Sequence, residues 1–170
     1  IDIDNAVTSA SGLFEDGITP VNTFYGLIVG NDHTVNNLKT KSYSDDNNVY
    51  SSLIVFNKGI ITNLKIGTTA ADTTNTDLML RTDGKTTITA TASGTKTAFA
   101  APIAAVNVGQ ILNCTALSAT EISAVSAAVE SAFAGALTAN NEYGIIKDCT
   151  NSLTAGTVKA TMSENAVVIT

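Results

Sequence analysis

The stretch YSSLIVFNKGIITNLKI, at residues 50–66, carries the strongest fold signal in the chain. Its first seven residues, Tyr50 to Phe56, are rich in aromatic and β-branched side chains and predict a strong strand. Gly59 lies in the turn that follows and can adopt a positive φ at no steric cost. In the next segment Ile60, Leu64 and Ile66 share one face, and polar residues occupy the other. The stretch therefore predicts two antiparallel strands joined in a hairpin.

Strand patterns continue on both sides of this hairpin. A buried strand is expected at residues 24–29, and Asp83-Gly84 is a typical two-residue hairpin turn before an alternating strand at residues 86–92. Further strands are expected at residues 104–108, 111–114, 143–147, 157–162 and 166–170. No strict internal repeat is evident. The fold class predicted is mainly β, an antiparallel, jelly-roll-like β-sandwich.

One segment, at about residues 118–137, has a helical pattern. Ser118 and Glu121 form a capping box, in which each side chain can bond a free N–H group of the first turn. Apolar residues recur on one helical face, so we expect one α-helix packed on the sandwich. This apolar stripe consists of Ile122, Val125, Val129 and Phe133.

The 170 residues are enough for one domain. Residues 1–20 are polar and rich in turn residues, so they are predicted to form an N-terminal arm, and residues 21–170 the single domain. Both termini also have strand character, which either adds a strand to a neighbouring subunit or closes the chain's own sheet. The residues expected in such an inter-subunit strand are Ile1, Ile3, Val167, Val168 and Ile169.

The composition favours a protein packed into a large assembly. Charged residues make up 14% of the chain, against about 25% in an ordinary soluble domain. The net charge of −6 argues against a nucleic-acid partner, which needs clustered basic residues. The longest apolar run, residues 98–106, is interrupted by Pro102 and is too short for a transmembrane segment.

The first residue and the cysteines indicate an oxidising compartment. Ile1 stands where a full reading frame would have Met, as after removal of a leader or trimming of the chain. An even number of cysteines favours one disulfide, between Cys114 and Cys149, over two unrelated buried thiols. The expected location is extracellular, at a cell surface or in a virion.

Few residues are available for catalysis. His33 is the single histidine, and no serine lies in a Gly-x-Ser-x-Gly elbow. Asp45-Asp46, with Asn47 or Asn48, could hold calcium, but solvated loop acids are the simpler interpretation. We therefore expect no enzyme, no cofactor and no metal. Asn113 begins the chain's N-x-[ST] sequon, a candidate glycosylation site.

Residues 58–114 carry a resemblance to a known family. GIITNLKI at residues 59–66 precedes a Thr/Ala spacer, DLMLRTDG at residues 77–84, a Thr-rich strand and VGQIL at residues 108–112. This order resembles small jelly-roll domains of bacteriophage and virion surface and fibre proteins. The resemblance implies a structural or adhesive role.

The expected function is that of a structural, self-assembling subunit of an extracellular or virion assembly, such as a filament, fibre, sheath or capsid surface. Its partners would be copies of itself or other proteins of the same assembly. The alternative is a carbohydrate- or receptor-binding adhesion module with glycans as partners, for which Tyr43 is the best candidate platform. A hydrolase would depend on His33 alone.

Overall fold

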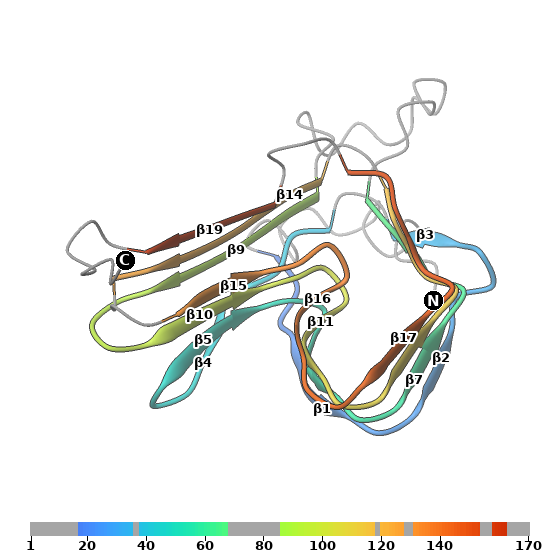
Figure 1. Cartoon of the computed structure of the whole chain (residues 1–170), viewed down its shortest axis with the longest axis horizontal. Coiled ribbons are helices and arrows are strands. Elements are labelled where there is room, and N and C mark those ends of the chain that lie inside the picture. The colour runs from blue at the N-terminus through green and yellow to red at the C-terminus, as the bar shows by residue number, and fades with distance from the viewer. Residues whose placement is uncertain are drawn as a thin grey trace.

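The computed structural model describes residues 17–35, 38–67, 86–117, 120–127, 131–153 and 158–162, and its regular elements there are all β-strands. Strands from successive passes of the chain stack in parallel and form a β-solenoid of about three turns (Figure 1). We call these passes layers. Within these ranges the first layer contains only strands β1–β3. Each of the other layers contains five strands there: β5–β9 in the second, β10–β14 in the third and β15–β19 in the fourth.

Three sheets take one strand from every layer, and all their neighbouring strands are parallel. The first consists of β1 (Val21–Phe24), β6 (Ile54–Asn57), β11 (Ala104–Asn107) and β16 (Thr138–Asn141). The second consists of β2 (Leu27–Val29), β7 (Ile60–Thr62), β12 (Gln110–Leu112) and β17 (Ile145–Lys147). The third consists of β3 (Thr34–Val35), β8 (Lys65–Ile66), β13 (Thr115–Ala116) and β18 (Thr150–Asn151).

Two further sheets pack against each other on the other side of the solenoid (Figure 1). The fourth consists of β4 (Tyr43–Ser44), β5 (Asn48–Ser51), β10 (Thr97–Ala100) and β15 (Ala132–Ala134). The fifth consists of β9 (Thr86–Ala92), β14 (Thr120–Ser126) and β19 (Val158–Met162). Among the strands of the described ranges, β4 and β5 form the one antiparallel pair.

The prediction of an antiparallel, jelly-roll-like sandwich is wrong. β7 does not fold back on β6 but pairs in parallel with β2 and β12. The turn before Gly59 is therefore a corner between two sheets, and not a hairpin. Ile60 points outward and is 37% exposed, whereas Ile61 is fully buried. Runs such as β11, buried at all four positions, suit parallel sheets, which are covered more completely than antiparallel ones.

The predicted helix at about residues 118–137 is also wrong, since β14 and β15 lie in the described part of that range. Ile122 and Ala124 are fully buried and Val125 is half-buried, which is the period of two expected for a strand. The register places Ile122 beside Ile88 of β9. Pairing with neighbouring layers outweighed the local helix signals. Ser118 and Val129 lie outside the described residues, as do Asp83-Gly84.

A short repeat accompanies the corners, although no strict repeat was predicted. The pattern N-x-G-x-I-x-N occurs at residues 57–63 and again at 107–113, and the two copies stack. In the fourth layer Asn141 and Gly144 continue it with one extra residue between them. The sequence separation is 50 residues from Asn57 to Asn107 but 34 from Asn107 to Asn141, and this uneven spacing hides the period.

The solenoid interior is filled mainly by isoleucine and alanine in columns that run through the layers. Ile61 and Ile111 occupy one such column and are fully buried. The largest fully buried apolar side chains also include Ile54, Ile88, Ile103 and Ile122. The described residues contain no helix of the length and apolarity needed to span a membrane.

Candidate functional site

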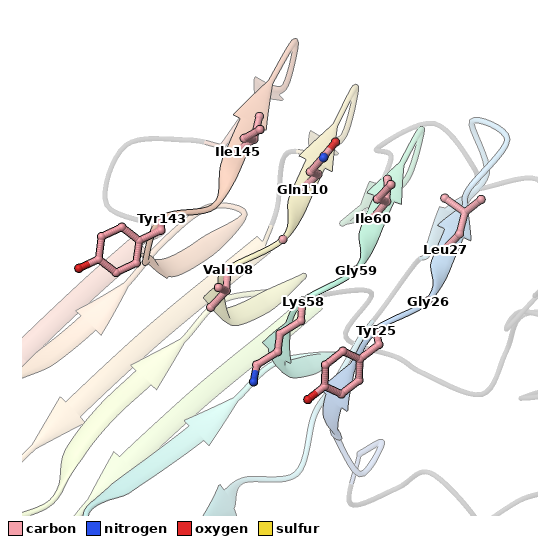
Figure 2. Close-up of a pocket in the computed structure, with 11 residues that line it drawn as sticks. Tyr25, Gly26, Leu27, Lys58, Gly59, Ile60, Val108, Gln110, Tyr143 and Ile145 are labelled. Carbon is pink, nitrogen blue, oxygen red and sulfur yellow. The ribbon is translucent and has the colours of Figure 1, made fainter.

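An open groove of about 600 Å³ runs across the layers at the corner between the first and second sheets. Two outward-facing rows of side chains line it, with one member of each row per layer (Figure 2). The glycines of the corner lie between the rows, so the groove floor is largely backbone. One row consists of Tyr25, Lys58, Val108 and Tyr143, and the other of Leu27, Ile60, Gln110 and Ile145.

Glycine at the floor of the groove is required by close packing of the layers. A Cβ atom added to Gly59 would lie 2.2 Å from the carbonyl oxygen of Gly26, and one added to Gly109 would lie 2.1 Å from that of Gly59. Real Cβ atoms do not approach backbone that closely. The stacked glycines thus keep the floor of the groove narrow and flat.

A ladder of asparagine side chains supports the groove from inside. Asn57 donates from Nδ2 to Oδ1 of Asn107 at 2.7 Å, and Asn107 donates in the same way to Asn141 at 2.7 Å. Asn57 and Asn107 are fully buried, where unpaired amides would be costly. The amide of Asn141 continues to the carbonyl of Gly144 at 2.8 Å. This chain of bonds holds the corner in one position in successive layers.

The two tyrosines at the ends of the groove are freely accessible. Tyr25 is 72% exposed and Tyr143 is 94% exposed. Between them, the Nζ atom of Lys58 lies 5.5 Å from the ring centroid of Tyr25, a cation–π distance. The groove therefore combines aromatic faces, aliphatic walls, one amide and one cation.

Tyr43, the predicted sugar platform, lies elsewhere. It is half-buried, and its ring is tilted against Tyr50 with 6.1 Å between centroids. Tyr50, Phe99 and Phe133 continue this column as stacked rings with centroid distances of 5.2 and 5.0 Å. The column stabilises the packing along the fourth sheet, and Tyr50 already occupies one side of the Tyr43 ring.

The two residues of the predicted calcium pair, Asp45 and Asp46, lie in different surroundings. Asp45 Oδ1 accepts the backbone N–H groups of Asn47 and Asn48, and its Oδ2 accepts the hydroxyl of Tyr50 at 3.1 Å. Partial burial alone would raise the pKa of Asp45, but these hydrogen bonds hold it below its usual value. Burial, and then the Asp45 charge, raise the pKa of Tyr50. Asp45 therefore organises a turn, and the exposed Asp46 does not join it.

Cys114 and Cys149 are free thiols, so the predicted disulfide is wrong. They occupy equivalent places in the third and fourth layers, where side chains of parallel strands leave in the same direction. Each sulfur donates to backbone carbonyls instead: Cys114 to Leu112 at 3.3 Å and Cys149 to Lys147 at 3.3 Å. Burial raises the pKa of the Cys114 thiol, which lowers its reactivity.

The remaining predicted residues are not brought together. His33 is exposed beside β3, and its carbonyl accepts the N–H of Lys65. Asn113, the sequon residue, is exposed at a corner with φ of 51°. Within the described ranges no group of three or more His, Cys, Asp or Glu residues is placed to hold a metal ion. Ile1, Ile3, Val167, Val168 and Ile169 lie outside those ranges.

Sequence reasoning missed the groove because it assigned Tyr25 to a buried strand and Tyr143 to a further strand of the sandwich. The signal was present in the corner pattern. In the second and third layers, the residue between the buried Asn and the Gly must point outward, and Lys58 and Val108 occupy that place. Comparison with protein-family models, with curated proteins and with solved structures found no match.

Proposed function

We propose that the chain is a structural, self-assembling subunit whose solenoid is lengthened by stacking copies end to end. The assembly would be a filament or fibre, extracellular or on a virion. The observation that carries this proposal is the open end of the solenoid, where residues at core positions have no further layer above them within the described part of the chain. The low charge content, 14% of residues, also suits a surface that packs against other subunits.

Exposure rises abruptly in the fourth layer at positions that are buried in inner layers. Ile146 is 40% exposed, whereas Ile61 and Ile111 in the same column are fully buried. The same contrast holds in the fifth sheet, where Met162 is 49% exposed and its neighbour Ser126 is fully buried. One more layer would cover these side chains, and the hydrophobic effect would stabilise the contact.

The opposite end offers a matching surface. β1, β2 and β3 are edge strands, and edge strands carry backbone N–H and C=O groups that can pair with another chain. Ile28 of β2 lies in the same column as Ile61 and Ile111, yet it is only half-buried, whereas those two side chains are fully buried. A copy stacked in register would place Ile145 and Ile146 of one subunit over Leu27 and Ile28 of the next. Parallel strand addition of this kind gains main-chain hydrogen bonds.

The two ends are different surfaces, so the contact would be heterologous. Heterologous contacts produce rings when the rotation closes and open filaments when it does not. A solenoid advances along its axis with little rotation for each layer, which favours the open filament. In such a filament, the parallel sheets of one subunit would continue into the sheets of the next.

The test places one negative charge at the open end and one on a side. Ile146→Asp puts a carboxylate in the contact, and Asn113→Asp puts one at an exposed corner of the third layer. We expect the critical concentration for assembly to rise by about tenfold or more in Ile146→Asp, because a buried unpaired charge costs more than about 1.4 kcal/mol. Sedimentation and electron microscopy of the full chain measure it.

Asn113→Asp is expected to assemble as the wild type does, because Asp tolerates the same positive φ as Asn. Circular dichroism checks that both variants keep the β-fold. Wild-type chain that stays monomeric at all concentrations would overturn the proposal. Equal effects of the two substitutions would show that the open end is not the contact.

A further inference from the structure

We propose that the groove binds an acidic carbohydrate chain laid across the layers, parallel to the solenoid axis. This inference concerns a lateral face and does not depend on end-to-end assembly. It rests on the accessible tyrosines, on the backbone at Tyr143 and on the charge of the lining.

Tyr25 and Tyr143 present ring faces at the two ends of the groove (Figure 2). Their exposed fractions, 72% and 94%, contrast with the 3% of Tyr50 in the aromatic column. A ring this exposed adds little to folding, yet it can stack on the apolar face of a pyranose ring. Binding sites combine such aromatic surfaces with a few polar groups, and Gln110 and Lys58 supply these here.

The backbone of Tyr143 supports a binding role. The described residues other than glycine with positive φ are Asn or Asp, except Tyr143 with φ of 63°. Asn and Asp tolerate this conformation, whereas for a bulky residue it is an outlier. The extra residue in the fourth-layer corner thus carries a strained, solvent-exposed tyrosine at the end of the groove, and strain of this kind concentrates at binding sites.

The charge of the groove selects an acidic ligand. Lys58 is its one charged lining residue, although the chain as a whole carries a net charge of −6. The described salt bridges join Lys65 to Asp32 and Lys147 to Asp148, so Lys58 has no carboxylate partner within the described ranges. A sugar carboxylate would complement it, with an ion pair strengthened by hydrogen bonding.

The repeat of the groove matches a chain of sugars. Strands in neighbouring layers lie about 4.8 Å apart, so Tyr25 and Tyr143, three layers apart, are separated by about 14 Å along the axis. Each sugar of an extended 1,4-linked pyranose chain lengthens the chain by a distance similar to this spacing of about 4.8 Å between layers. A stretch of about three sugars would therefore reach from one tyrosine to the other, with its middle carboxylate near Lys58.

Isothermal titration calorimetry of the full chain with a hexamer of 1,4-linked galacturonic acid tests the proposal. Cellohexaose serves as the neutral sugar and poly-glutamate as the acidic polymer without sugar rings. We expect the galacturonate hexamer to bind at least about tenfold more tightly than either control. No binding of the hexamer, or equal binding of cellohexaose or poly-glutamate, would overturn the inference.

Matched variants locate the site. Tyr143→Ala and Lys58→Gln should each weaken hexamer binding by about tenfold or more. Phe133→Ala removes an exposed ring outside the groove, and Lys147→Gln removes an exposed lysine of β17 that does not line it. Both controls should bind as the wild type does. Binding that Tyr143→Ala and Lys58→Gln leave unchanged would place the ligand elsewhere and refute the groove.

Discussion

Asn107 shows how much one buried polar side chain contributes to this fold. Its amide accepts a hydrogen bond from Asn57 and donates one to Asn141, both at 2.7 Å. Asn fits this place because its side chain offers a donor and an acceptor and can therefore repeat the same bond from layer to layer. The ladder sets the register of the corner, because a shift of one residue would leave buried amides unpaired.

Asn107→Ala should lower the free energy of unfolding by about 2–3 kcal/mol, because it removes both ladder hydrogen bonds of Asn107 and leaves the buried Asn57 amide short of an acceptor. Urea denaturation followed by circular dichroism measures the change. Asn47→Ala, at an exposed loop position, is the control and should change stability by less than about 0.5 kcal/mol. Similar losses in both variants would mean that the ladder contributes nothing specific.

The corner between the first and second sheets shows how local sequence and packing combine at the level of the element. Gly59 was predicted to permit a hairpin through a positive φ, but the structure requires glycine there for a different reason. The Cβ of any other residue would collide with backbone of the layer beneath. The same residue type serves both turns, so its presence could not distinguish a hairpin from a corner.

Gly109→Ala should destabilise the protein by about 2 kcal/mol or more, because the new methyl group would lie 2.1 Å from the carbonyl oxygen of Gly59. Gly26→Ala tests the same corner in the first layer. Its methyl group would meet only the flexible ring of Phe24, at 3.2 Å, so a loss below about 1 kcal/mol is expected. Thermal and urea unfolding of the two variants give the comparison, and equal losses would refute the close packing of layers.

β14 is the element where local signals were most misleading. Its residues carry apolar positions that fit a helical stripe and also an alternating strand. The helical interpretation used Ile122 and Val125, whereas the strand buries Ile122 and Ala124. Alanine is a good helix former, but a small residue is also what close packing of facing sheets needs. Pairing with β9, more than thirty residues earlier in the chain, decides that this segment forms a strand and not a helix.

For the whole molecule, the layered construction predicts uneven stability. Each layer is held mainly by its neighbours, as in other repeat architectures, so an end layer has support on one side only. The third layer is covered by the second and the fourth, and Ile111 is fully buried. Among the described strands none covers Ile146 in the fourth layer, and this side chain is 40% exposed, so the fourth layer should open locally before the rest unfolds.

Hydrogen exchange measures this gradient. In monomeric protein, backbone amides of β12 should exchange at least about tenfold more slowly than those of β17. Assembly should slow exchange in β17, because a following subunit would cover it, and should change β12 little. Uniform protection across the two strands in the monomer would contradict a layered stability, and β17 protection that assembly leaves unchanged would contradict end-to-end stacking.

The sequence by itself determined that the chain is β-rich, and it placed several strands close to where they occur, among them residues 104–107 and 110–112. This information is local, since strand propensity and turn residues act over a few positions. Tertiary structure decided which strands pair and in which direction, and therefore which side chains face out. Parallel partners in the sheets lie from 31 residues apart, as Thr34 and Lys65 do, to 50 residues apart, as Ile54 and Ala104 do, and no local pattern specifies them. The groove and the open end exist only because distant residues stack in register, where backbone hydrogen bonds and buried columns outweigh local preference.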